Sequence, residues 1–538
     1  MKSWIKWLDK NILLLLSGFL IAFIPLFPKI PFFSPIETYI VRVRIEDFLI
    51  LFTFIIWLVQ LIRKKIKIKS FTTWAILAYL VAGLLSVISS LWIIKTVPLT
   101  GDHVLKTALH YFRYLEYFSL FFIVYSSISK PKDVKQLLTV TSLSLLGISI
   151  YGIGQKYYYW PVYSTMNREF SKGIRLYLTE HARVQSTFAG HYDLAAYLVI
   201  ILPIILALAY SAKKRSLKIG LFLLQLLGCW LLIMSAARTS FAAYGLASSI
   251  VIILFGFRQN KIWPKISWIA SRFASLWIII FIMMASFGSD IYDRFLQVVE
   301  SYPQLHSQYL IIEEKTLLVT DNLSSTLKPD SPLADKTPPE NSISTADAAV
   351  IVASDERPSP ERPRDVYQDI PDQIVVATTS AEGVTGTTII EKPRVWSDNA
   401  LKYGLSMAIR LDTLWPRAIQ GFLRNPLFGS GYATLNKTSL TDFTIADSTD
   451  NNFLRTLGET GFLGFITFYG AVISGLAIAV KGIKSKKELL VALSVGYLAA
   501  TIGLLFNALY IDVFAASKVA LTFWAVTGIF LGYYEVSK

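Results

Sequence analysis

Long apolar runs separated by short polar connections dominate the pattern of this chain. Twelve runs approach the roughly 20 residues that cross a bilayer as a helix, and a helix satisfies its backbone hydrogen bonds internally, as lipid requires. The pattern therefore predicts an all-α, polytopic membrane protein with about twelve transmembrane helices. The predicted spans are residues 12–28, 47–62, 71–92, 109–127, 136–153, 193–211, 217–234, 238–257, 267–288, 462–480, 488–509 and 515–535.

The predicted spans form two groups that a long connection separates. Residues 1–288 hold the first nine spans, and residues 462–538 hold the last three. Residues 289–461 form a large loop, within which 320–392 is rich in Pro, Ser, Thr and acidic residues. This insert is expected to be disordered because it cannot bury enough apolar surface to fold. The flanks of the insert carry apolar residues at helical spacing, which predicts short helices there.

The short basic connections all fall on one side of the predicted topology. They lie at 63–69, 130–135, 213–218, 258–265 and 481–487. Short loops rich in lysine and arginine stay in the cytoplasm. The pattern therefore places both termini in the cytoplasm and the large loop on the periplasmic, or extracytoplasmic, side of a bacterial inner membrane.

Composition agrees with a membrane protein and narrows the chemistry. Of the 538 residues, 54% are apolar and 17% are charged, whereas about a quarter are charged in soluble domains. The net charge of +15 lies mainly in connections between spans, which indicates membrane orientation and not nucleic-acid binding. Cys229 is the single cysteine, so an intrachain disulfide or a cysteine metal cluster is excluded. No Asp-x-Asp motif or His/Cys cluster requires a metal or another cofactor.

Arginines on the predicted outer side are the first candidates for chemistry, because positive charge there opposes the usual topology. They are Arg42, Arg44, Arg183, Arg238 and Arg410. The planar guanidinium suits bidentate recognition of phosphate oxygens, so these residues predict a diphosphate site at the outer leaflet. Snorkelling or salt-bridged arginines, such as Arg44 with Asp47, are the alternative.

Ionisable residues within or beside predicted spans are further candidates. The fourth span contains His110, Arg113 and Glu116 in "LHYFRYLEYFSLFF", and the three lie on one helical face. Such residues are functional candidates by default, but a pair between Arg113 and Glu116 that holds helices together is the favoured interpretation. Glu459, close to the tenth span, is expected to stabilise a helix N-terminus.

Four stretches resemble the O-antigen ligase and polymerase superfamily of bacterial envelope glycosyltransferases. They are "RVQSTFAGHYDLAAYL" (183–198), "IMSAARTSFAAY" (233–244), "RLDTLWPRAIQGFLRNPLFGSGY" (410–432) and "DNNFLRTLGETGFLGF" (450–465). The second is similar to the family's Ser-x-x-Arg turn, and the third to the amphipathic helix and Asn-Pro-x-x-Gly-x-Gly segment of its large outer loop. The likeness covers roughly residues 40–530 apart from the insert.

The resemblance implies a function in the biosynthesis of lipopolysaccharide or another cell-envelope polysaccharide. A glycan would move from an undecaprenyl-diphosphate donor to a hydroxyl of a lipid-anchored, glycan or protein acceptor, on the outer side of the bilayer. Arg183, Arg238 and Arg410 match the arginines that hold the diphosphate leaving group in this family. Arginine supplies cationic stabilisation of the leaving group without a metal.

The base that activates the acceptor departs from the family's pattern. Ligases of the family use a loop histidine before an asparagine, whereas here Asp450 precedes Asn451. A carboxylate can serve as a base, so Asp450 is the expected catalytic residue. His191 is the alternative, although it could instead cap the sixth helix, and Asp442 and Asp447 are nearby options. The departure leaves a ligase and a repeat-unit polymerase both open.

Two other classes of function are less consistent with the pattern. Transporters tend to have broken helices and polar groups near the bilayer midplane, whereas the charges here lie at outer span ends. A non-enzymatic scaffold leaves the outward arginines without a role. A metal-independent glycosyltransferase is therefore the favoured hypothesis.

Overall fold

The structure is a computed structural model, which describes residues 2–36, 39, 42–66, 68, 70–166, 170–179, 182–288, 372–379, 385–392, 405–435 and 448–538. The long helices are α1 (Lys2–Leu26), α2 (Ile45–Ile62), α3 (Phe71–Ile88), α4 (Gly101–Ser127), α5 (Pro131–Tyr157), α6 (His191–Ser211), α7 (Arg215–Met234), α8 (Arg238–Gly256), α9 (Ile262–Phe287), α15 (Asn452–Ile483), α16 (Glu488–Asn507) and α17 (Ser517–Ser537). Shorter segments are η1 (Ser89–Ile93), η2 (Phe170–Lys172), α13 (Leu405–Ile409), η3 (Arg410–Leu414) and α14 (Trp415–Arg424).

Eleven helices in the described part of the chain are long and apolar enough to cross a membrane. They coincide with eleven of the predicted spans, so a polytopic helical membrane protein is confirmed. The remaining predicted span, 109–127, falls on α4, a helix of 27 residues that carries Lys106, Arg113 and Glu116 and is not among the eleven. α4 packs against α1, α2, α3 and α17. The charged side chains of α4 therefore have neighbouring helices to pack against.

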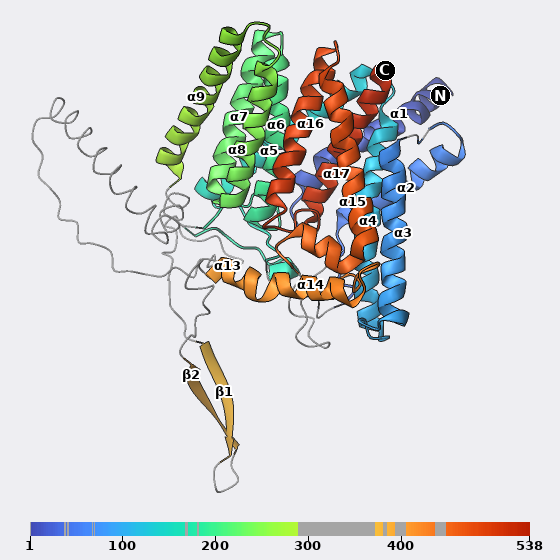
Figure 1. The fold of residues 1–538 in the computed structure, drawn as a ribbon, viewed down its shortest axis with the longest axis vertical. Coiled ribbons are helices and arrows are strands. Elements are labelled where there is room, and N and C mark those ends of the chain that lie inside the picture. The colour runs from blue at the N-terminus through green and yellow to red at the C-terminus, as the bar shows by residue number, and fades with distance from the viewer. Residues whose placement is uncertain are drawn as a thin grey trace, which may run out of the picture.

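Figure 1 shows the long helices side by side, with both termini at one end of the bundle and α13 and α14 lying across the other. We call the second end the α14 end. α6 packs against α7, α8, α16 and α17, whereas α9 lies at the edge and contacts α7 and α8. Successive helices alternate in direction, so several connections meet at the α14 end. Their described residues are 27–36, 39 and 42–44 (the α1–α2 connection), 94–100, 158–166, 170–179, 182–190, 235–237 and 508–516.

A β-hairpin corrects the expectation for the end of the predicted disordered insert. Strands β1 (Asp372–Thr379) and β2 (Thr385–Lys392) pair in antiparallel register, with Asp372 opposite Lys392. Both strands are rich in Ile, Val and Thr, the β-branched residues that favour extended backbone. The expectation of disorder is thus wrong for these two strands, and residues 320–371 lie outside the described part.

α15 is broken at Gly461, which has φ +66° and ψ −166°. The turn that follows α14, residues 426–431, lies against this break. Backbone groups that the break removes from the helical ladder need partners in a membrane protein, and the turn provides them. The hydrogen bonds run from Ser430 N to Gly458 O (2.8 Å), from Gly431 N to Glu459 O (3.0 Å) and from Phe462 N to Pro426 O (2.9 Å).

We call these main-chain hydrogen bonds between the turn and the break in α15 the interlock. The interlock predicts that substitution of two glycines of α15 changes the stability of the protein by very different amounts. A Cβ at Gly461 would lie 2.5 Å from main-chain atoms of Gly429 and Leu427, and its positive φ disfavours other residues. Gly461→Ala is therefore expected to destabilise the protein by more than about 2 kcal/mol. Gly470 has no neighbour within 4 Å, so Gly470→Ala should be neutral or stabilising by up to about 1 kcal/mol. Thermal unfolding in detergent compares them, and equal melting temperatures would contradict the interlock.

Candidate functional site

A cavity of about 230 Å³ lies where the α1–α2 connection, α4, α6, α15 and α17 meet. We call it the basic cavity. Asp193 is the one carboxylate among its lining residues. Its basic lining residues are Lys29, Arg44, His110, Arg113 and Arg455. Cations that converge on a small volume create a potential that attracts anions.

Arg113 is fixed in the wall of the basic cavity by three groups. Its Nη1 lies 2.8 Å from Asp47 Oδ1 and 2.9 Å from Glu116 Oε2, and its Nη2 donates to the carbonyl of Arg42 at 3.0 Å. The expected pair between Arg113 and Glu116 is confirmed. Asp47 also accepts a hydrogen bond from the backbone N–H of Arg44 at 3.0 Å. The first turn of α2 and the middle of α4 are thereby joined.

Lys29 connects the α1–α2 connection to two helices. Its ammonium lies 3.3 Å from Glu46 Oε1, with both side chains 2% exposed, and it also hydrogen-bonds to Ser517 at the start of α17. Sequence reasoning missed Lys29, although a lysine just beyond the first span on the outer side was a usable signal.

Burial controls the electrostatics of the α1–α2 connection. Burial lowers the pKa of Arg44. Burial, together with the charge of Arg44, lowers the pKa of Lys29 to about 8, against the opposing effect of Glu46. Both shifts disfavour the charged form because it is poorly solvated and close to like charges. A bound anion favours the charged forms of Lys29 and Arg44, so the attraction between these cations and an anion would stabilise the anion here.

Arg183 and His191 are brought together beside the basic cavity. Arg183 Nη1 lies 2.5 Å from His191 Nε2, and Nε2 is the acceptor because a guanidinium only donates. His191 is the first residue of α6, and Gly190 is the N-cap without a side-chain hydrogen bond. The interpretation of His191 as a helix cap is therefore wrong. Ala189 and Asp193, on either side of it in the chain, line the cavity.

Arg410 and Asp450, two of the predicted site residues, form a second pair. Arg410 Nη2 lies 2.9 Å from Asp450 Oδ2 and 3.3 Å from the carbonyl of Tyr510. Ser448 Oγ donates to Asp450 Oδ1 at 2.9 Å. Asp450 has φ +50°, and Arg410 opens the π-helical segment η3. Unusual backbone of both kinds is frequent at functional sites.

Asp512, in the α16–α17 connection, organises the segment around Asp450, and sequence reasoning missed it. Its buried carboxylate accepts hydrogen bonds from five groups. The donors are Ser448 Oγ (3.0 Å), Thr449 N (2.9 Å), Thr449 Oγ1 (2.9 Å), Asn451 N (3.1 Å) and Arg455 Nη1 (3.0 Å). A single carboxylate in a short outward connection was the available signal.

Two residues beside this segment have structural roles. Asn451 is the N-cap of α15, where its side chain accepts from Leu454 N at 3.0 Å. Glu459 lies two residues before the break in α15 at Gly461 and is 2% exposed, so its expected effect on the N-terminus of the helix that resumes after the break stays a prediction. Its Oε1 accepts from Ala433 N at 3.1 Å and lies 3.4 Å from Arg455 Nε. Asp442 and Asp447 lie outside the described residues.

Arg238 is the first residue of α8 and is exposed. The turn before it is buried and contains Ala236 with φ +48°. The segment of Arg183 runs beside this turn, since Val184 N donates to Met234 O at 3.0 Å. Arg183, Arg238 and Arg410 are not among the residues that line the basic cavity, whereas Arg44 and Arg113 are.

Comparison with models of protein families and with curated proteins gives no match to this chain. Within the described residues, no group of three or more His, Cys, Asp or Glu side chains is arranged to hold a metal ion. The basic cavity offers fixed cations for an anion. Outside its lining, one histidine (His191) and one carboxylate (Asp450) each contact an arginine.

Asp512→Asn tests whether this carboxylate holds the segment in place. The amide has one acceptor oxygen in place of two and no charge for Arg455, so a buried, charge-assisted cluster is broken. We expect a loss of about 3 kcal/mol or more in stability, measured by thermal unfolding. Asp450→Asn, at a side chain that is 36% exposed, should cost less than about 1 kcal/mol. Equal losses in the two variants would show that Asp512 is not the organising group.

Proposed function

We propose that this chain transfers a glycan from an undecaprenyl-diphosphate carrier to an acceptor hydroxyl on the outer side of the cytoplasmic membrane. In this proposal the α14 end faces outward and both termini are cytoplasmic. The reaction class is that of the O-antigen ligases and polymerases, which four stretches of the sequence resemble. The partners are the lipid-linked donor, an acceptor and the bilayer.

The basic cavity is the observation that carries the proposal. A diphosphate leaving group gains negative charge as the glycosidic bond breaks, and fixed cations stabilise that charge without reorganisation. Lys29, Arg44, Arg113 and Arg455 supply such cations from three separate segments, the α1–α2 connection, α4 and α15. Their burial removes competing water, which strengthens the interaction with an anion.

Asp450 suits the role of base better than His191. In its hydrogen bond with Arg183, the Nε2 lone pair of His191 is already engaged. Asp450 is partly exposed and is held by Arg410. If Arg410 turns toward a donor phosphate, Asp450 is left to accept the proton of the acceptor hydroxyl. The acceptor oxygen then attacks the anomeric carbon, and the electron pair of the broken bond leaves on the diphosphate.

Arginine-to-lysine variants test the cationic half of the proposal. Arg44→Lys and Arg410→Lys keep the charge but lose the planar fork, so we expect transfer from a polyprenyl-diphosphate-linked glycan to fall by about 10- to 100-fold. The matched control is Arg258→Lys at the opposite end, where Arg258 contacts both oxygens of Glu488 at 3.0 and 3.1 Å. Full activity in both site variants would refute the proposed phosphate role.

Asp450→Asn tests the base. Removal of a general base costs about 10²–10⁴-fold in rate, so turnover should fall by that order while donor binding persists. His191→Gln should retain most turnover. The reverse result would make His191 the base. The glycan profile of a deletion strain then separates the two activities: accumulated polymer with unmodified acceptor indicates a ligase, and single-unit glycans indicate a polymerase.

A further inference from the structure

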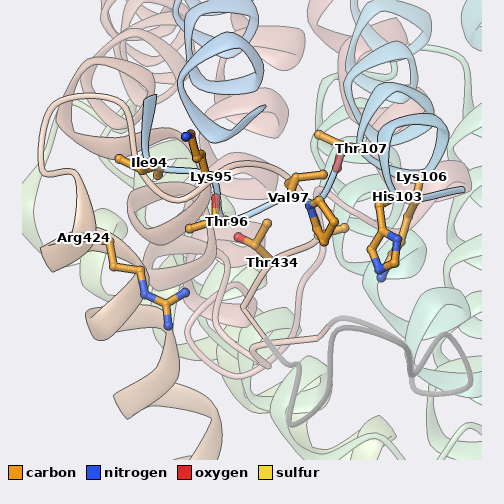
Figure 2. Close-up of a pocket in the computed structure, with 11 residues that line it drawn as sticks. Ile94, Lys95, Thr96, Val97, His103, Lys106, Thr107, Arg424 and Thr434 are labelled. Carbon is orange, nitrogen blue, oxygen red and sulfur yellow. The ribbon is translucent and has the colours of Figure 1, made fainter. Parts of the chain in front are cut away.

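A second and larger cavity, of about 650 Å³, lies at the same end of the bundle. It is bounded by the α3–α4 connection, the first turns of α4, the end of α14 and residues 433–434. Figure 2 shows Lys95 and Arg424 on one side of it and His103 and Lys106 on the other. None of the residues that line it is acidic, and all of them are described. We call it the α14 cavity.

The wall of the α14 cavity is held by hydrogen bonds of its threonines. Thr96 Oγ1 donates to Ser430 O at 2.6 Å, and Thr434 Oγ1 donates to Gly431 O at 2.7 Å. The backbone at Lys95 has φ +51°, a conformation that is retained only where surrounding contacts impose it. Lys95 and Arg424 are exposed, so their charges are accessible at the wall of the α14 cavity.

Large exposed apolar side chains flank the lining residues of the α14 cavity in the sequence. They lie within two positions of a lining residue in the chain and are 60–67% exposed. They are Trp92, Ile93, Leu99 and Leu423. Trp and aliphatic residues next to Lys and Arg are typical of the membrane–water interface. α14 itself lies across the end of the helices (Figure 1), the orientation of an interfacial amphipathic helix.

We propose that the α14 cavity binds an anionic membrane lipid. The phosphate of the headgroup enters the cavity between Lys95 and Arg424, and the acyl chains lie against Leu99 and Leu423. Charge-assisted hydrogen bonds to the phosphate provide the selectivity for an anionic headgroup, and the exposed apolar side chains provide contact with the chains. This proposal does not depend on the transfer reaction, because lipid binding is measured without donor or acceptor.

The experiment compares lipid retention by the full chain in phosphatidylcholine nanodiscs that contain a minor fraction of phosphatidylglycerol. After extraction into mild detergent, native mass spectrometry counts the phosphatidylglycerol that stays bound. Lys95→Gln/Arg424→Gln should reduce its enrichment by about tenfold or more. Lys132→Gln/Lys135→Gln, two exposed lysines of α5 at the opposite end, should leave it unchanged. Equal enrichment in all three proteins, or an equal fall in both variants, would overturn the proposal.

Two further arms separate a lipid from free phosphate. Leu99→Asn/Leu423→Asn should lower phosphatidylglycerol retention several-fold, and millimolar inorganic phosphate should not displace the lipid. Displacement by phosphate with no effect of the leucine variant would mean that the cavity takes free phosphate, and the lipid proposal would be wrong. If the double charge variant does not fold, Arg424→Gln alone, on the exposed last turn of α14, carries the same test, and Arg424→Lys should restore most of the binding.

Discussion

The break in α15 is the constraint on which the α14 end of this protein depends. A helix that is interrupted at the membrane must place its freed backbone groups on other protein groups. Around Gly461 these partners come from the turn after α14: Ser430 N and Gly431 N donate to the carbonyls of α15, and the carbonyl of Pro426 accepts from Phe462 N. The turn is thereby fixed to the bundle, and α14 is held across its end. Both cavities acquire a wall from this arrangement, since Ala433 and Thr434 line one and Arg455 lines the other.

Buried ion pairs hold further side chains in place at the α14 end, in addition to the main-chain hydrogen bonds. Asp512 binds Arg455 in the first turn of α15. Arg113 is bound by Asp47 and Glu116, and Lys29 is bound by Glu46. Such pairs contribute little net stability, because desolvation offsets the attraction, but removal of one partner is costly. Their consequence is geometric. Lys29, Arg113 and Arg455 are thereby restrained in direction before any ligand arrives, which is the condition for electrostatic stabilisation of a leaving group.

Sequence patterns predicted the bundle well because bilayer thickness imposes a length on each apolar run. Eleven runs became helices of the expected kind. The partners within the site were harder to predict, because they depend on contacts between residues far apart in the chain. Asp512 and Arg455 are 57 positions apart, and no local pattern joins them. The strands at 372–392 were missed because the acidic, Pro-rich stretch before them dominated the composition of the insert, although their β-branched residues favour strands.

α4 explains why the polar chemistry lies where it does. Lys106, His110, Arg113 and Tyr117 recur at intervals that place them on one helical face. Lys106 lines the α14 cavity, and the other three line the basic cavity. Between the cavities, the Lys106 ammonium lies 4.6 Å from the centre of the Tyr39 ring, and the Tyr39 hydroxyl hydrogen-bonds to His110 Nε2 at 2.9 Å. A face this polar is unfavourable toward lipid, so α4 must be enclosed by neighbouring helices. The same enclosure keeps the cations of α4 out of bulk water. Their attraction for an anion is stronger in this environment than it is in water.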